Sequence, residues 1–320
     1  MKIAVLDDYQ DCVRTLACFA KLDGHEVVVL NETIAEPRAL AARLAGVQAL
    51  VLIRERTRLT RELIELLPDL RAVSQTGRAG PHIDIAACDE RRIAVLAGSG
   101  SPFAPAELTF ALVLAAMRGI AAENAALRAG RWQTLLGRTV RGRTLGVLGY
   151  GNIGRLVGQY GAVFGMRVVA FGREASLQRA RADGVATVAS RRELFAASDV
   201  LSVHLRLAPE TRAAIGADDF AAMPAGALFV NTSRAELVAP GALLAGLDAG
   251  RPAMAAIDVF EHEPATGDPL IAHPNVLATP HIGYVERDSY ELYLGTAFDN
   301  LLAFAAGQPS GLVNPQALAG

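Results

Sequence analysis

The stretch RTLGVLGYGNIGRLVG (143–158) decides the fold. It opens as an apolar strand (143–149), passes through the glycine-rich turn GYGNIG (149–154), and continues with a helical pattern. In that context the three glycines allow a tight turn, a close approach of the backbone to a pyrophosphate, and close helix–sheet packing. The N–H groups at the start of the helix attract an anion. We therefore predict a Rossmann dinucleotide-binding unit whose cofactor contacts include Gly149, Tyr150, Gly151, Asn152, Ile153 and Gly154.

Short apolar runs alternate with amphipathic segments on both sides of this unit. The expected strands are 2–6, 26–30, 48–53, 71–75, 93–97, 143–149, 167–171, 185–189, 199–205, 227–231, 254–260 and 275–280. Strands that alternate with helices favour parallel sheets joined by right-handed crossovers. We predict an α/β protein with two doubly wound parallel-sheet domains.

Two helical patterns interrupt the alternation. Residues 105–130 read as one long helix that ends at Gly130, and the stretch from Glu286 to Gly307 reads as another. The first is apolar over its first half, so we expect it to be buried in an interface.

The composition excludes several classes of function. Of the 320 residues 52% are hydrophobic and 20% charged, the net charge is −2, and no block of like charges occurs, so binding to nucleic acid or to a membrane is not expected. The N-terminus lacks the features of a signal peptide. Three cysteines in no metal-binding spacing favour a reducing cytoplasm, and no metal site is expected.

The end of the second strand of the Rossmann unit bears on the cofactor. In RVVAFGRE (167–174) the acidic residue that normally binds the ribose is replaced by Gly172, eighteen residues past Gly154. The missing carboxylate would no longer repel a 2′-phosphate, and Arg173 could pair with one. This favours NADP, whereas NAD remains possible if Arg173 is solvated and Glu174 binds the ribose.

Polar residues follow three later strands, in VNTSRAE (230–236), AIDVFEHEP (256–264) and TPHIG (279–283). Ligands of open α/β sheets bind at the carboxyl ends of the strands. Arg234 could hold a substrate carboxylate, His281 could transfer a proton, and Glu263 could orient the imidazole. Taken singly, they could be a surface arginine, a satisfied histidine and a turn residue. Their spacing does not show that they converge.

These motifs in this order resemble the D-isomer-specific 2-hydroxyacid dehydrogenase family. GRWQ (130–133), SVHLRLAPETR (202–212) and GQPSGLVNP (307–315) extend the resemblance over essentially the whole chain. It implies a discontinuous, flavodoxin-like substrate domain (1–100 plus 286–320) and a Rossmann NAD(P)-binding domain (101–285). It also implies a homodimer with the helix after Pro102 in its interface.

The resemblance further implies roles for individual residues. Arg234 would bind substrate, His281 would be the acid/base and Glu263 its partner. Asp258 would bind the nicotinamide carboxamide, with Thr232, Ser233 and His204 as further cofactor-binding residues. The loop TGRAGPHID (76–84) would hold the substrate carboxylate through the backbone of Arg78, Ala79 and Gly80.

Four positions depart from the family pattern. Ala79 stands where glycine is more common, and Pro81 where an acidic residue is. Arg206 replaces a proline, and Tyr284 replaces a small residue after HIG. None of these touches Arg234, Glu263 or His281, but they leave the shape of the substrate pocket open.

The implied function is that of an NAD(P)-dependent oxidoreductase that transfers a hydride between the nicotinamide and a small 2-oxoacid or D-2-hydroxyacid. The NADP preference favours the reductive direction, as in glyoxylate/hydroxypyruvate reductases. One alternative is 3-phosphoglycerate dehydrogenase activity. Another is a non-catalytic NAD(H)-binding corepressor or sensor of the same fold. The sequence does not identify the substrate.

Overall fold

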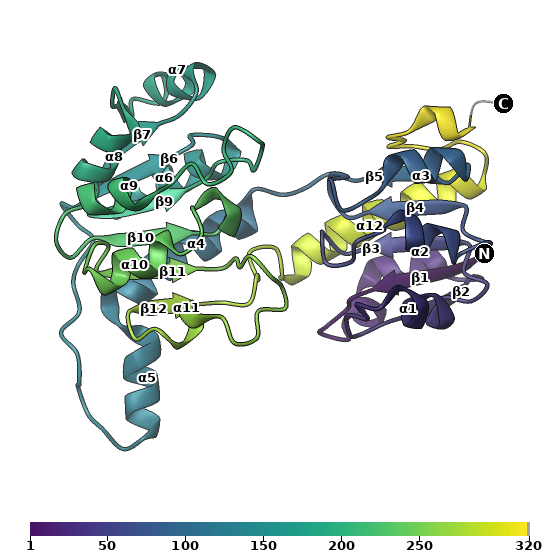
Figure 1. Cartoon of the computed structure of the whole chain (residues 1–320), viewed down its shortest axis with the longest axis horizontal. Helices are drawn as coiled ribbons and strands as arrows, with labels where there is room; N and C mark the ends of the chain where they lie inside the picture. Colours follow the sequence, from purple (N-terminus) through teal and green to yellow (C-terminus); the bar gives the residue numbers. More distant parts are fainter. Residues whose placement is uncertain (319–320) are drawn as a thin grey trace. The chain divides into compact units, whose positions relative to one another are not determined.

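The computed structural model describes residues 1–318 and divides into two compact units (Figure 1). Unit 1 contains Met1–Ser101 and Glu286–Gly320, and unit 2 is the continuous segment Pro102–Val285. Residues 319–320 of the expected 286–320 segment lie outside the described residues. Each unit has its own sheet and its own hydrophobic core.

Unit 1 is built on a five-stranded parallel sheet in the order β2-β1-β3-β4-β5. Its strands are β1 (Lys2–Leu6), β2 (Glu26–Val29), β3 (Ala49–Leu52), β4 (Ala72–Gln75) and β5 (Ala94–Ala97). This order is that of the flavodoxin-like folds and confirms the predicted class of this domain. The edge strand β2 is only half-buried, whereas β3 and β4 are buried throughout.

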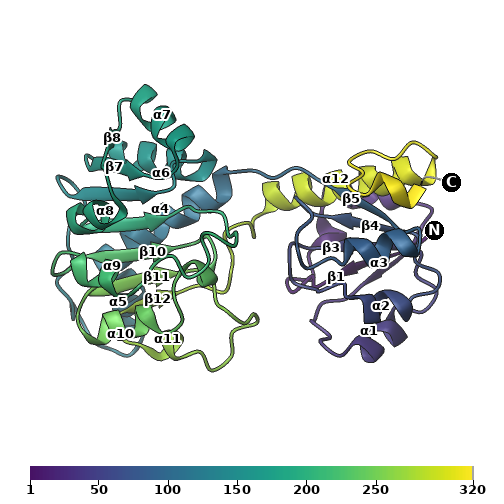
Figure 2. The same cartoon turned by 45° about the horizontal axis from the view of Figure 1, so that its top comes forward.

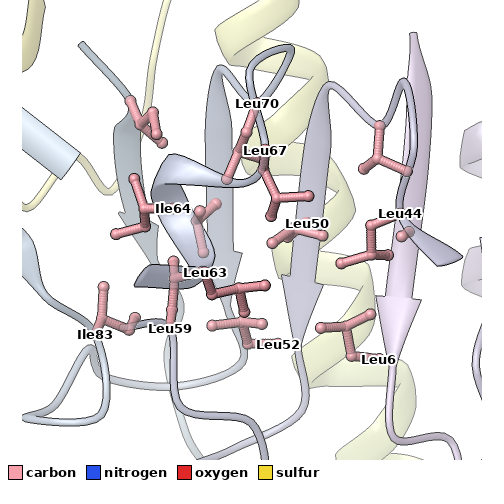
Figure 3. Packing of buried hydrophobic residues seen from close by; sticks show 14 of the residues in the cluster. Leu6, Leu44, Leu50, Leu52, Leu59, Leu63, Ile64, Leu67, Leu70 and Ile83 are labelled. Carbon is pink, nitrogen blue, oxygen red and sulfur yellow. The ribbon is translucent and has the colours of Figure 1, made fainter. Parts of the chain in front are cut away.

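Helices cover both faces of this sheet. The elements are η1 (Val13–Thr15), η2 (Ala17–Leu22), α1 (Pro37–Arg43), α2 (Arg61–Glu65), α3 (Ile85–Glu90), α12 (Arg287–Ala305) and η4 (Pro315–Leu318). Helices α1 to α3 share one apolar cluster with the strands, and Figure 3 shows Leu52 of β3 close to Leu63 of α2. In the same view α12 lies behind the strands, where it contacts β3, β4 and β5. The last helix therefore returns the chain to the first sheet.

Unit 2 is built on a seven-stranded parallel sheet in the order β12-β11-β10-β9-β6-β7-β8. Its strands are β6 (Thr144–Leu148), β7 (Arg167–Phe171), β8 (Ala186–Thr187), β9 (Val200–Val203), β10 (Leu228–Asn231), β11 (Met254–Ile257) and β12 (Val276–Ala278). The strand order reverses between β6 and β9, as in a Rossmann sheet. The predicted Rossmann class is confirmed.

Two apolar clusters cover the faces of this second sheet. The helical elements are α4 (Phe103–Arg118), α5 (Ile120–Arg128), α6 (Asn152–Val163), α7 (Glu174–Ala182), α8 (Arg191–Ala197), α9 (Ala217–Ala222), η3 (Ala235–Leu237), α10 (Ala242–Asp248) and α11 (Pro269–Ala272). Helices α4, α6 and α7 contribute to one cluster, and α8, α9 and α10 to the other. Figure 2 shows α9 and α10 on the side of the sheet opposite to α4.

The prediction of one long helix over 105–130 was wrong. The chain forms α4 and α5, which meet at an angle of 60° at Gly119. Gly119 is left-handed, with φ 61°, and its N–H bonds back to Ala115 and Ala116 as a helix C-cap. The apolar pattern continues across the break, which is why the sequence reads as a single helix.

Among residues 1–318, a single helix of the length and apolarity needed to cross a membrane does not occur. Helices α4 and α5 meet that length and composition only together, as the bent pair.

Candidate active site

The sequence-predicted residues of unit 2 gather at the carboxyl edge of its sheet. Following the strand order β7-β6-β9-β10-β11-β12, the edge carries these segments in sequence: 172–173, 149–154, 204, 232–234, 258–263 and 281. A parallel sheet brings the carboxyl ends of neighbouring strands to one side. Residues separated by more than a hundred positions therefore become neighbours.

The turn after β6 is shaped by close contacts that only glycine allows at two of its positions. Gly149 has φ 95°, and a Cβ there would lie 2.7 Å from the His204 carbonyl oxygen. A Cβ on Gly154 would lie 2.3 Å from the Gly149 carbonyl oxygen, so only glycine lets α6 approach β6. A Cβ on Gly151 would meet nothing within 4 Å, which leaves open space at the start of α6. No side chain caps this helix within the described chain, so its first N–H groups can receive an anion.

Tyr150, at the second position of the turn, points away from this space. It is fully buried, and its hydroxyl donates to Asp183 at 3.2 Å, which also receives two hydrogen bonds from Arg155 at 2.6 and 2.8 Å. Burial, together with the Asp183 carboxylate, raises the pKa of Tyr150 to about 12. Tyr150 therefore links the turn to Asp183 at the end of α7, and Arg155 links α6 to the same carboxylate.

The end of β7 carries an arginine and no carboxylate at the strand terminus. Arg173 is exposed at the start of α7, and among residues 1–318 its guanidinium has no partner. The Glu174 carboxylate instead pairs with Arg181 of the same helix at 2.9 Å. The group that could have bound a ribose is thus engaged along α7.

His204 follows β9 and lies beside the turn. Its backbone N–H donates to the Leu148 carbonyl at 2.7 Å, and Nε2 of its ring is 2.8 Å from the Ser202 hydroxyl. Burial lowers the pKa of His204 to about 3. The imidazole is therefore neutral at physiological pH and adds no positive charge to this part of the edge.

The loop after β10 is fixed by its own polar groups. The Asn231 side chain donates to the Arg234 carbonyl at 2.9 Å and accepts from the Ser233 N–H at 3.0 Å. The Ser233 hydroxyl donates to Val203 of β9 at 2.7 Å. Arg234 places one Nη on the Ser233 carbonyl at 2.7 Å. The loop therefore holds the arginine at the sheet edge.

His281 and Glu263 form the central contact of the site. His281 Nδ1 lies 2.6 Å from one carboxylate oxygen of Glu263, and the Phe260 N–H donates to the other at 3.0 Å. Burial opposes ionisation of Glu263, yet the hydrogen bond and charge of His281, the Phe260 N–H and the charge of Arg234 hold its pKa below the usual range. An ionised carboxylate on Nδ1 leaves Nε2 as the reactive nitrogen. Nε2 has no partner among the described residues.

Asp258 lies beneath the loop that carries His281. Its carboxylate accepts from the Thr279 hydroxyl at 2.7 Å and from the N–H groups of Ile282 and Gly283, each at 2.8 Å. Burial raises the pKa of Asp258, and these donors oppose that rise. The residue has no exposed surface, so a ligand reaches it only when a neighbouring side chain moves. In this structure Asp258 holds the histidine loop, in which His281 has a left-handed φ of 51°.

Two departures from the family pattern have different surroundings. Tyr284 is buried and sets its ring edge-to-face against His281, with 5.5 Å between ring centroids. This contact limits the movement of the His281 imidazole. Arg206 is exposed, and its carbonyl accepts from the Thr211 hydroxyl at 2.7 Å.

Arg78, Ala79 and Gly80 belong to unit 1, in the loop between β4 and α3. The Ala79 methyl packs against the apolar core of that unit. Within residues 1–318 the N–H groups of all three residues have no protein acceptor, so this loop offers successive donors to an anion. The loop is braced by His82, which bonds the Gln75 side chain at 2.9 Å.

The sequence did not reveal the contribution of α4. Thr109 of this helix is fully buried and lies 2.7 Å from the Thr232 hydroxyl. A threonine inside the apolar run AELTFALVLAA was the available signal. No group of three or more His, Cys, Asp or Glu side chains suited to a metal ion occurs among residues 1–318.

A Rossmann sheet with a glycine cradle, and an arginine and a histidine–glutamate pair at one edge, defines a nicotinamide-dependent dehydrogenase class. Comparison with known families supports this class. Residues 110–283 match the family model described as "D-isomer specific 2-hydroxyacid dehydrogenase, NAD binding domain". The chain belongs to the D-isomer-specific 2-hydroxyacid dehydrogenase family, as its motifs predicted.

Individual relatives support this assignment. A glyoxylate reductase of Aeropyrum pernix is 38% identical over 265 residues, which cover 79% of this chain and 79% of the relative. A D-3-phosphoglycerate dehydrogenase of Methanocaldococcus jannaschii is 36% identical over 73% of this chain but only 45% of its own length. A crystal structure from Ralstonia solanacearum, provisionally named a D-3-phosphoglycerate dehydrogenase oxidoreductase, is 54% identical with a TM-score of 0.98, covering 100% of this chain and 98% of that one.

Proposed function

We propose that this protein is a reductase of small 2-oxoacids that uses NADPH. The observation that carries the proposal is the His281–Glu263 pair, held at 2.6 Å on the same sheet edge as Arg234 and the glycine cradle. A bound nicotinamide supplies the hydride, and the protein supplies the proton, the charge and the alignment.

Each residue of the trio has a distinct task in this proposal. Glu263 holds Nδ1 of His281, so that Nε2 delivers the proton to the substrate oxygen during reduction. Arg234 binds the substrate carboxylate and stabilises the negative charge that develops on the carbonyl oxygen. In the oxidative direction the same Nε2 accepts the proton.

We assign further ligand-binding groups to each of the two units. Unit 2 would bind the cofactor through Gly149 to Gly154, with His204, Thr232, Ser233 and Asp258 near the nicotinamide. Unit 1 would bind the substrate carboxylate through the N–H groups of Arg78, Ala79 and Gly80. Free donors in that loop and the open space above Gly151 support this assignment. The three cysteines form no disulfide with one another, which supports a cytoplasmic location.

The substrate is best identified by a direct screen. Glyoxylate, hydroxypyruvate, pyruvate, phenylpyruvate and 3-phosphohydroxypyruvate would each be tested with NADPH and with NADH. Reduction of glyoxylate or hydroxypyruvate is expected to be fastest. A clear preference for 3-phosphohydroxypyruvate would favour phosphoglycerate dehydrogenase activity, and turnover of none of these acids would favour a non-catalytic sensor.

The cofactor preference rests on three residues at the end of β7. Gly172 places no carboxylate there, Arg173 is unpaired among the described residues, and Glu174 is paired with Arg181. A guanidinium without a partner can bind a 2′-phosphate without first breaking an ion pair. NADP is therefore favoured over NAD.

Arg173→Ala is expected to lower the ratio of kcat/KM with NADPH to kcat/KM with NADH by about 10- to 100-fold, the value of a hydrogen bond to a charged group. Arg179→Ala removes an exposed arginine from the same helix and serves as the matched control. The ratio in the control should stay close to that of the unmodified protein. Equal ratios in all three proteins would show that Arg173 does not recognise the phosphate.

We also propose a homodimer formed through α5 and the segment that follows it. Trp132, Leu135 and Leu136 are exposed by 76%, 54% and 99%. The segment folds back on α5, because Glu123 accepts hydrogen bonds from Thr134 and from the Leu135 N–H. Figure 1 shows α5 continuing beyond the edge of the sheet of unit 2. Apolar side chains gathered on such a projection are typical of a subunit interface.

Leu136→Asp is expected to convert the dimer into a monomer, because the carboxylate would be buried without a partner. Size-exclusion chromatography with light scattering gives the mass directly. Leu66→Asp, on an exposed site of unit 1, is the control and should remain dimeric. A wild-type protein that runs as a monomer at micromolar concentration would overturn the proposal.

A further inference from the structure

A chain of two threonine hydroxyls links helix α4 to the loop after β10. Thr109 Oγ1 lies 2.6 Å from the carbonyl oxygen of Pro105 and 2.7 Å from Oγ1 of Thr232. Thr109 is fully buried, whereas Thr232 is partly exposed at the sheet edge. The Thr109 end of this pair of hydroxyls is therefore buried in α4, and the Thr232 end is at the proposed nicotinamide subsite.

The direction of the hydrogen bonds in this chain follows from the chemistry of its ends. The Pro105 carbonyl can only accept, so it takes the single hydroxyl proton of Thr109. Thr109 then accepts from Thr232, whose own proton is committed inward. The hydroxyl of Thr232 turns only lone pairs toward the exposed side.

The hydroxyl proton of Ser233 and one amide proton of Asn231 are already used within the loop. Ser233 donates to Val203, and the Asn231 side chain is bonded at both its nitrogen and its oxygen. The start of α4 also supports the histidine loop, since a Cβ on Gly283 would lie 3.7 Å from Pro105. The start of α4 therefore contacts two loops. It fixes the direction of the Thr232 hydrogen bond, and it packs against the loop that carries His281.

We propose that Thr109 is a positioning residue that makes Thr232 a hydrogen-bond acceptor, and that Thr232 thereby recognises the N–H₂ side of the nicotinamide carboxamide. The inference rests on the proposed cofactor site and goes beyond it, because it assigns the polarity of one contact and the residue that sets it. A ligand with a methyl ketone in place of the carboxamide keeps the carbonyl but lacks the donor that Thr232 requires.

The experiment compares the dissociation constants of two reduced dinucleotides, the natural carboxamide and its 3-acetylpyridine analogue, by isothermal titration calorimetry. For each variant, the dissociation constant of the analogue is divided by that of the carboxamide. This ratio is then compared with the same ratio in the unmodified protein. This comparison cancels the intrinsic differences between the two rings. Thr232→Val should lower the ratio by about 2- to 10-fold, the value of one neutral hydrogen bond.

The variants of Thr109 test the relay itself. Thr109→Val keeps the shape but frees the proton of Thr232, so it should lower the ratio to a similar extent. Thr109→Ser keeps the hydroxyl and should preserve the ratio. In the Thr232→Val background, Thr109→Val should have no further effect. Melting temperatures of all variants check the fold, and Thr232→Val reports the polarity even if Thr109→Val does not fold.

The outcomes separate this inference from the function on which it rests. If both threonine-to-valine variants bind the cofactors with an unchanged ratio, the relay is wrong while the cofactor site stands. An equal loss of both dinucleotides in Thr232→Val would mean that Thr232 donates to the carbonyl, which also overturns the proposal. If the unmodified protein binds neither dinucleotide, the proposed function fails as well.

Discussion

His281→Ala will lower kcat for 2-oxoacid reduction by roughly 10²- to 10⁴-fold, the range that a positioned general acid contributes. The physical reason is specific to Nε2. Glu263 occupies Nδ1 at 2.6 Å, so the imidazole has one nitrogen for the substrate, and alanine removes it. Arg234→Ala should produce a loss of similar order, because it removes the charge that stabilises the developing alkoxide. Steady-state rates and single-turnover traces of NADPH oxidation measure both.

The control is a histidine from the same loop as Glu263. His262 is exposed and has no partner among residues 1–318, so His262→Ala should retain the kcat of the unmodified protein. Cofactor affinity, measured by calorimetry, should change by less than about 3-fold in His281→Ala. Turnover near normal in both His281→Ala and Arg234→Ala would contradict the proposed mechanism.

Gly151→Ala and Gly154→Ala will affect different properties, although the two glycines lie three residues apart. Gly154→Ala will lower the stability of the fold, and Gly151→Ala will lower the affinity for the dinucleotide. A Cβ on Gly154 would lie 2.3 Å from a backbone oxygen, so alanine must push α6 away from β6. We expect the free energy of unfolding to fall by about 1–3 kcal/mol, the usual cost of overpacking. A Cβ on Gly151 meets nothing within 4 Å, and its backbone is extended, so the fold should tolerate alanine to within about 1 kcal/mol.

The same methyl on Gly151 occupies the space in which the pyrophosphate would lie. The affinity for the dinucleotide should therefore fall by about 10- to 100-fold, since overpacking by one methyl costs about 1–3 kcal/mol. Chemical denaturation gives the stability and calorimetry gives the affinity. Gly216→Ala, where a Cβ also meets nothing within 4 Å, is the control outside the cradle. Unchanged cofactor affinity in Gly151→Ala would place the pyrophosphate elsewhere.

The fold could be predicted from the sequence because its strands are short, apolar and separated by turn residues. Each expected strand forms, although several are shorter than their apolar runs, as 185–189 shows by contributing only Ala186–Thr187. The break at Gly119 was missed. An isolated glycine inside a helical pattern signals a cap only when tertiary packing prefers a turn there, and the spacing of apolar residues does not record that choice.

The residues of the candidate site could be selected from the sequence, but the contacts between them could not be predicted. Arg234, Glu263 and His281 stood out because each follows a strand, whereas the 2.6 Å contact depends on where two loops end in space. The threonine relay was invisible for the same reason, since Thr109 and Thr232 are far apart in the sequence. The burial of Asp258 beneath the histidine loop also follows from packing, which a motif does not encode.

The order of the strands fixes how far apart the groups along the carboxyl edge of the second sheet lie. Neighbouring strands are about 4.8 Å apart, so the four steps from β7 through β6, β9 and β10 to β11 measure roughly 19 Å. The group that would read the 2′-phosphate is at one end of this length and the residues around His281 are beyond the other. A mononucleotide is too short to occupy both ends at once. With the proposed assignment of the two ends, the spacing of the strands would itself favour a dinucleotide over a mononucleotide.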